Sequence, residues 1–139
     1  MAAADDISKL LGVDENVGPA ARIKQVRDGL PYAALERIRE YLDLTTEELA
    51  RAVAISPRTL ARRKEEDRLK LEESDRIARL ARVLVHAVGV MGSAEKASRW
   101  LKRPNPTLDG LSPLEVLDTD LGSQLVDELL TRIEYGVLS

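Results

Sequence analysis

Cysteine and phenylalanine are absent from this chain of 139 residues, which has one tryptophan and three tyrosines. Without cysteine the chain can form no disulfide, bind no metal through a thiolate and use no cysteine nucleophile. With so few aromatic side chains, a buried core must consist mainly of leucine, isoleucine, valine and alanine, which suits helices packed against helices. The length is that of one domain, or of one compact domain with an appended module.

Long apolar segments are missing as well. No run approaches the ~18 consecutive apolar residues of a membrane-spanning helix. The first residues, MAAADDISKLL, lack the basic region and the cleavage pattern of a secretory signal. We therefore expect a cytoplasmic protein that does not contact a membrane.

Motifs for catalysis and metal binding are also lacking. The chain has no glycine-rich phosphate loop, no His-Glu-x-x-His and no nucleophile elbow. Its single histidine, His86, falls on an apolar helix face with no partner near it in sequence, so a packed or partly exposed histidine is expected rather than a ligand or general base. Acidic clusters at 65–67, 72–75 and 118–120 fall at helix starts or links, where they cap and solvate helices. We predict no enzymatic activity, no metal site and no cofactor.

A helical pattern of apolar residues is present along most of the chain. Its longest stretch covers about 72–91, where Ile77, Leu80 and Leu84 follow the 3.6-residue period. No segment alternates at period two for long enough to predict a strand, so the predicted fold class is all-α. Residues 1–18 are expected to form a loose arm with one helical turn around Ile7–Leu11. The predicted divisions are an N-terminal arm and first helix over 1–28, a helix-turn-helix region over 29–71 and a C-terminal helical module over 72–139.

The stretch from Thr45 to Lys64 reads TTEELARAVAISPRTLARRK. Thr45 followed by Glu48 is typical of a capping box, in which the two side chains bind each other's free helix-end amides. Ser56 and Pro57 mark a second helix start, a side-chain cap followed by a residue whose missing N–H costs nothing there. Two short capped helices across a tight turn indicate a helix-turn-helix, whose second helix enters the DNA major groove. A solvated helical hairpin inside another all-helical domain is the alternative interpretation.

Operator DNA is the partner that the second helix suggests. Residues 51–82 hold ten Lys and Arg against six Asp and Glu, although the whole chain has a net charge of −3. A local positive surface can attract phosphates on an acidic protein. Acidic residues 65–67 limit this surface, so we expect a homodimer or larger assembly on DNA. The side chains predicted to face outward and contact DNA are Ser56, Arg58, Thr59, Arg62, Arg63 and Lys64.

The C-terminal end has an unusual composition. Gly136 is predicted to end the last helix, and Val137, Leu138 and Ser139 follow with no charge beyond the terminal carboxylate. A short apolar peptide with a carboxylate at its tip suits insertion into a pocket of another protein. Burial of these residues against their own fold is the alternative.

Several motifs resemble those of the Xre/MbcA/ParS antitoxins. ESDR-x-x-RLARVL, WL-x-x-PN, PL-x-x-LDT and RIE-x-G occur in the order expected for that family, and the likeness spans about Gly29 to Ser139. The resemblance implies a helix-turn-helix head and a C-terminal helical toxin-binding module. It also implies an antitoxin whose partner is a RES-domain toxin that degrades NAD.

In that family the last residues occlude the toxin's active-site cleft, and the helix-turn-helix autoregulates the operon. By position, the resemblance implies toxin contacts at Arg132, Ile133, Glu134, Tyr135, Gly136, Val137, Leu138 and Ser139. A stand-alone helix-turn-helix transcription regulator, whose C-terminal helices only mediate dimerisation, is the alternative hypothesis. A scaffold that has lost DNA binding is a further one.

Overall fold

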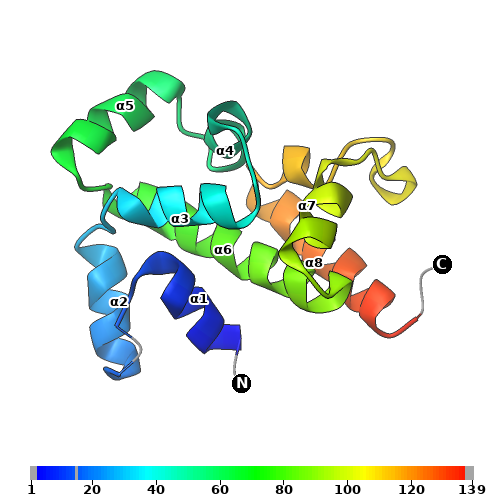
Figure 1. The fold of residues 1–139 in the computed structure, drawn as a ribbon, viewed down its shortest axis with the longest axis horizontal. Coiled ribbons are helices and arrows are strands. Elements are labelled where there is room, and N and C mark those ends of the chain that lie inside the picture. Colours follow the sequence, from blue (N-terminus) through cyan, green and yellow to red (C-terminus); the bar gives the residue numbers. More distant parts are fainter. Residues whose placement is uncertain (1–2, 15, 137–139) are drawn as a thin grey trace.

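The computed structural model describes residues 3–14 and 16–136. Within these ranges the secondary structure is helical and no strand occurs, so the predicted all-α fold is confirmed. The helices pack around a long central helix, α6 (Figure 1). In chain order they are α1 (Ala3–Leu11), α2 (Pro19–Arg27), α3 (Ala33–Tyr41), α4 (Thr46–Ala52), α5 (Pro57–Glu66), α6 (Leu71–Met91), α7 (Ala94–Lys102), the 3-10 turns η1 (Pro106–Leu108) and η2 (Leu114–Val116), and α8 (Asp120–Glu134).

The central helix α6 makes contact with α1, α2, α7 and α8. Its predicted apolar face is buried, with Ile77 and Leu84 fully inaccessible and Leu80 nearly so. Burying one such side chain contributes roughly 1.5–3 kcal/mol. Among the described residues no single helix is long and apolar enough to cross a membrane, and α6 and α7 satisfy that test only as a pair bent by 111°.

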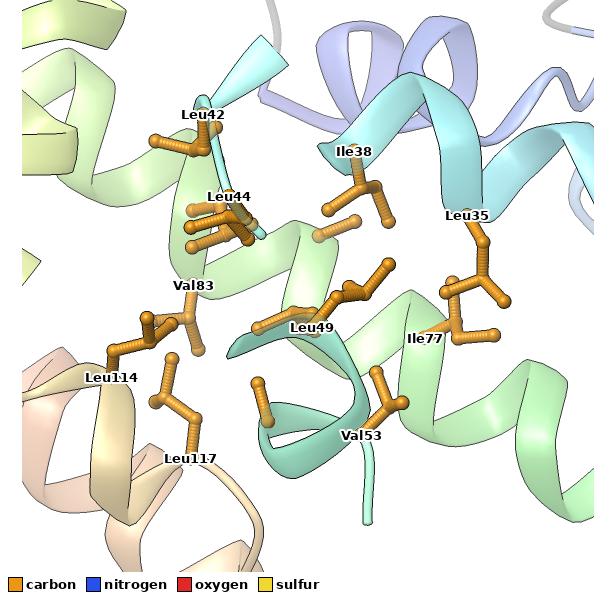
Figure 2. Packing of buried hydrophobic residues seen from close by; sticks show 14 of the residues in the cluster. Leu35, Ile38, Leu42, Leu44, Leu49, Val53, Ile77, Val83, Leu114 and Leu117 are labelled. Carbon is orange, nitrogen blue, oxygen red and sulfur yellow. The ribbon is translucent and has the colours of Figure 1, made fainter. Parts of the chain in front are cut away.

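One hydrophobic core joins the N-terminal and C-terminal parts of the molecule. Leu49 of α4 and Val53, the residue that follows α4, project toward α6, where Val53 lies near Ile77 (Figure 2). On the other side of α4, Leu114 and Leu117 from the η2 region approach α6 (Figure 2). The two parts of the chain therefore do not have separate cores.

The N-terminal segment differs from the predicted loose arm. Over the described residues it forms α1, which packs on α3 and α6, and Leu11 and Val13 are buried. The guanidinium of Arg37 donates to the backbone carbonyls of Leu10 and Leu11 at 3.0 Å each, which satisfies free acceptors at the end of α1. This tertiary contact holds a short helix that would be marginal alone.

Two glycines in helices provide a matched test of the packing. A Cβ on Gly122, in the first turn of α8, would overlap the carbonyl oxygen of Val116, whereas a Cβ on Gly89 in α6 would meet open space. We expect Gly122→Ala to lower the free energy of unfolding by roughly 1–3 kcal/mol. Gly89→Ala should raise it by about 0.5–1 kcal/mol. Urea denaturation of both variants measures the difference, and equal effects would contradict the close approach of α8 to η2.

Candidate functional site

Helices α4 and α5 form the predicted helix-turn-helix, and both predicted caps are present. The Thr45 N–H donates to Glu48 Oε1 at 2.8 Å, and the Glu48 N–H donates to Thr45 Oγ1 at 3.0 Å. At the start of α5, Ser56 Oγ accepts the N–H of Thr59 at 3.1 Å, with Pro57 in the first helical position. The hydroxyl of Ser56 therefore serves the cap.

The turn between these helices is held by α6. Ala54 has a left-handed backbone with φ of 55°, a conformation that costs an L-residue roughly 1–2 kcal/mol. Arg76 Nη1 from α6 donates to the carbonyls of Val53 at 3.1 Å and Ala54 at 2.8 Å. Ile55, which follows, is buried. These contacts fix the direction in which α5 leaves the turn.

The outward surface of α5 carries some of the predicted DNA-contacting side chains. Arg58, Ala61, Arg62 and Glu65 are exposed and share one helix face at i, i+3, i+4 and i+7. Lys64 is exposed beside this face. Helix α5 lies toward one end of the long axis of the molecule (Figure 1). A cationic helix is thus open to a partner, and DNA contact by Arg58 and Arg62 stays a prediction.

Arg63 does not belong to that surface. Only 4% of it is exposed, and its Nε donates to Glu73 Oε1 of α6 at 2.7 Å. Its Nη1 also donates to Glu66 Oε1 at 3.1 Å. The prediction that Arg63 faces outward with the DNA-contacting residues is therefore wrong, because its guanidinium is buried and bound to the carboxylates of Glu73 and Glu66.

Glu73 is ionised at neutral pH in spite of its burial. Burial raises the pKa of this carboxyl, but hydrogen bonds from Arg63 and the Lys70 N–H, with the charges of Arg63 and Arg76, outweigh it and leave the pKa below its usual value. The Lys70 N–H donates to Glu73 Oε1 at 2.9 Å. One carboxylate therefore both neutralises Arg63 and caps the start of α6.

Helix α8 buries one face and exposes another. Val126, Leu129 and Leu130 lie in the interior. The opposite side, which we name the α8 stripe, consists of exposed residues at i, i+4, i+7, i+11 and i+14. Three of its members are apolar or aromatic, with exposed fractions of 66%, 42% and 74% for Leu121, Leu125 and Tyr135. In full, the α8 stripe is Leu121, Leu125, Glu128, Arg132 and Tyr135.

The described part of the predicted toxin-contacting segment lies at the surface. Arg132, Glu134, Tyr135 and Gly136 are exposed and Ile133 is half-buried. Val137, Leu138 and Ser139 lie outside the described residues. The last turn of α8 lies toward the end of the long axis opposite α5 (Figure 1).

Similarity to known proteins covers both regions. Residues 21–82 match the antitoxin Xre-like helix-turn-helix domain, and residues 86–136 match the antitoxin Xre/MbcA/ParS C-terminal toxin-binding domain. Antitoxin Xre of Photorhabdus laumondii subsp. laumondii is 34% identical over 116 residues, which is 82% of this chain and 78% of that protein. Antitoxin Xre of Yersinia enterocolitica is 35% identical over 127 residues, 87% of this chain and 86% of that protein. The chain belongs to the Xre antitoxin family.

Two more distant proteins resemble this Xre-family chain. A chain of the M. tuberculosis MbcT–MbcA toxin–antitoxin complex superposes with a TM-score of 0.59 at 27% identity, covering 78% of this chain and 96% of that one. A protein of Sphingobium sp. named Prs ADP-ribosylating antitoxin is 24% identical over 131 residues, 87% of this chain and 82% of that protein.

The structure brings together partners that local sequence patterns could not reveal. His86 of this Xre-family chain has no partner near it in sequence, yet its Nδ1 lies 3.1 Å from Asp127 Oδ1 and its Nε2 lies 3.6 Å from Glu134 Oε1. Both carboxylates come from α8, more than forty residues along the chain. Arg76 likewise donates to the carbonyls of Val53 and Ala54, which precede it by 23 and 22 residues. Among the described residues, no three His, Asp or Glu side chains are grouped to hold a metal ion.

Replacing Glu73 tests how strongly the buried pair holds the helix-turn-helix. Glu73→Ala leaves the guanidinium of Arg63 with the more exposed Glu66 as its remaining partner, and it removes the cap of α6. We expect the free energy of unfolding at pH 7 to fall by about 3 kcal/mol in urea denaturation. Glu72→Ala, an exposed neighbour in the same turn, should change it by less than about 1 kcal/mol.

The pair also predicts a pH dependence. Because the pKa of Glu73 is lower in the native state than in the unfolded chain, its contribution to stability is present above about pH 4.5 and is lost as the pH falls further. The difference in unfolding free energy between the wild type and Glu73→Gln should shrink between about pH 5 and pH 3. A difference that stays constant over this range would contradict the assignment.

Proposed function

We propose that this chain is the antitoxin of a type II toxin–antitoxin pair and acts without catalysis in the cytoplasm. It neutralises a RES-domain, NAD-degrading toxin by placing its C-terminal segment in the toxin's active-site cleft. As a homodimer, it also represses its own operon through α4 and α5. The observation that carries the proposal is the match of residues 86–136 to a toxin-binding domain that ends where the exposed Tyr135 leads into the chain terminus.

The α8 stripe supports the toxin-binding half. Leu121 and Leu125 expose apolar surface on the same face of α8 that ends at Tyr135, and aromatic side chains such as tyrosine anchor many protein interfaces. Beyond them, Val137, Leu138 and Ser139 carry no charged side chain. The name of the Sphingobium relative refers to ADP-ribosylation, a reaction that consumes NAD and so agrees with a toxin partner that uses NAD.

The surface of α5 supports the DNA-binding half. Arg58 and Arg62 are exposed guanidiniums on one helix face, suited to guanine edges and phosphates. Glu65 on the same face reduces the attraction of a single subunit for DNA. Two subunits, each with α5 in one major groove, would add their phosphate contacts on a two-fold operator. The doubled number of phosphate contacts favours a dimer as the DNA-binding form.

Removing residues 135–139 tests the occlusion. We expect the truncated protein to keep its helical circular dichroism and operator binding but to lose inhibition of the co-encoded toxin, because the inserted peptide is missing. NAD loss, measured in a mixture of toxin and antitoxin, gives the readout. Leu71→Ala, which trims an exposed apolar residue at the start of α6, should inhibit as the wild type does. Full inhibition by the truncated protein would contradict occlusion by the C-terminal segment, whereas no inhibition by the wild type would favour the stand-alone regulator.

A double substitution on α5 tests the repressor half. Arg58→Ala with Arg62→Ala should weaken binding to DNA from upstream of the gene by at least about tenfold, and should reduce the salt slope by about 1 per lost phosphate contact. Mobility shifts at several stated salt concentrations measure both. Lys96→Ala with Arg103→Ala removes the same charge from exposed positions distant from α5, so it is the control. If both double variants weakened binding equally, the assignment of α5 as the DNA-contacting helix would be wrong.

A further inference from the structure

Charged side chains join α6 and α8 along one side of their contact. Asp120, Asp127 and Glu134 repeat every seven residues on α8, and each faces a basic side chain of α6. Arg79 Nη1 lies 3.9 Å from Asp120 Oδ1, and Arg82 Nη1 lies 3.0 Å from Asp127 Oδ2. The partners advance together along both helices, in agreement with the similar direction of α6 and α8 in Figure 1.

His86 occupies the last position of this series. Its two ring nitrogens face two different carboxylates, Asp127 at 3.1 Å and Glu134 at 3.6 Å. The imidazole side chain is 28% exposed and Asp127 23%, so this part of the series is only partly open to solvent. Nδ1 is within hydrogen-bond distance of Asp127, whereas Nε2 lies in a longer polar contact with Glu134. His86 therefore links the middle of α8 to its final residue.

Within the part of the chain that the structure describes, the last turn of α8 has few other attachments. Leu130 is the last fully buried residue of α8, and Ile133 is half-buried. The N–H groups of Tyr135 and Gly136 bind carbonyls within the same turn. Over the described residues from 131 to 136, the contact of Glu134 with His86 is the one contact between ionisable side chains that reaches another helix. The position of the last turn thus depends on Ile133 and on His86.

We propose that His86 is a positioning residue that clamps the last turn of α8 and so sets the direction in which the C-terminal segment leaves the molecule. Its consequence for the toxin rests on the function proposed above, in which that segment enters the toxin's cleft. A segment that already points the right way loses less conformational freedom on binding. The clamp itself is a property of the free protein and can be measured without toxin.

A clamp and a general structural role predict opposite results for His86→Leu. Leucine fills the half-buried site, and Asp127 keeps Arg82 as a cationic partner at 3.0 Å, so the fold should lose little stability. The contacts to Asp127 and Glu134 are nevertheless lost. A clamp therefore predicts local fraying with an unchanged or higher melting temperature, whereas a structural role predicts a lower melting temperature together with exchange throughout α8.

The experiment uses the full chain with three substitutions. Hydrogen exchange of the Tyr135 and Gly136 amides should be at least fivefold faster in His86→Leu, with the melting temperature unchanged or raised. His86→Lys supplies a polar side chain that can reach both carboxylates, so its exchange should return to within twofold of the wild type. Arg79→Leu breaks the pair at the start of α8 and should leave these two amides unchanged. Inhibition of the toxin by His86→Leu should require three- to tenfold more antitoxin.

Several results would overturn the proposal. If the Tyr135 and Gly136 amides exchanged at the wild-type rate in His86→Leu, the proposed clamp would be wrong. Equally fast exchange of these amides in Arg79→Leu would also contradict it. Faster exchange with undiminished inhibition of the toxin would separate the clamp from toxin binding. If the chain lacking residues 135–139 still inhibits fully, the proposed function fails, while the exchange data on the free protein still decide whether His86 holds the last turn.

Discussion

The burial of one face of α6 is the constraint on which the whole structure depends. This helix has 21 residues and so spans about 32 Å. Along that length its buried residues pack against α1, α2, α7 and α8. Because the same helix starts beside α5 and continues beside α8, the candidate DNA-binding and toxin-binding surfaces are mounted on one rigid element. Loosening the middle of α6, for example at Leu84, would disturb both.

Polar side chains at the two ends of α6 position those surfaces. At its beginning, Glu73 binds Arg63 of α5, and Arg76 binds the carbonyls of the turn before α5. Toward its end, Arg82 and His86 bind acidic side chains of α8. The apolar face thus supplies most of the favourable free energy, while these directional contacts determine how the neighbouring helices are oriented. Neither kind of contact could replace the other.

Features that depend on neighbours in sequence could be predicted. The caps at Thr45 and Ser56 and the long helix around Ile77 follow from side chains within one turn of each other, so their residue types alone indicate them. Arg63 shows the limit, because a basic residue suggests a solvent-facing position unless its buried partner is known. That partner, Glu73, lies ten residues away on another helix. The outward face predicted for α5 therefore wrongly included Arg63.

Contacts between distant segments could not be read from local patterns. Nothing near His86 in sequence indicates Asp127 or Glu134, and nothing in the first residues indicates that Arg37 will hold the end of α1. In α8, Leu125 and Leu129 both fit an apolar pattern, yet Leu129 is buried and Leu125 is exposed. The periodicity gives the width of an apolar face but not how much of it the neighbours cover. Here the uncovered part is what a partner can bind.

The buried pair of Arg63 and Glu73 raises the question of why a helix-turn-helix would keep a charge where an apolar side chain could pack. Replacing a buried ion pair with apolar groups is often neutral or stabilising. Here Glu73 also accepts the N–H of Lys70 and so caps α6, a task that no apolar side chain can perform. An apolar residue at position 63 alone would leave the buried Glu73 carboxylate without its bound cation. An apolar residue at position 73 alone would leave the buried Arg63 guanidinium without its buried carboxylate. The two positions are therefore coupled, and both substitutions together would still lose the cap.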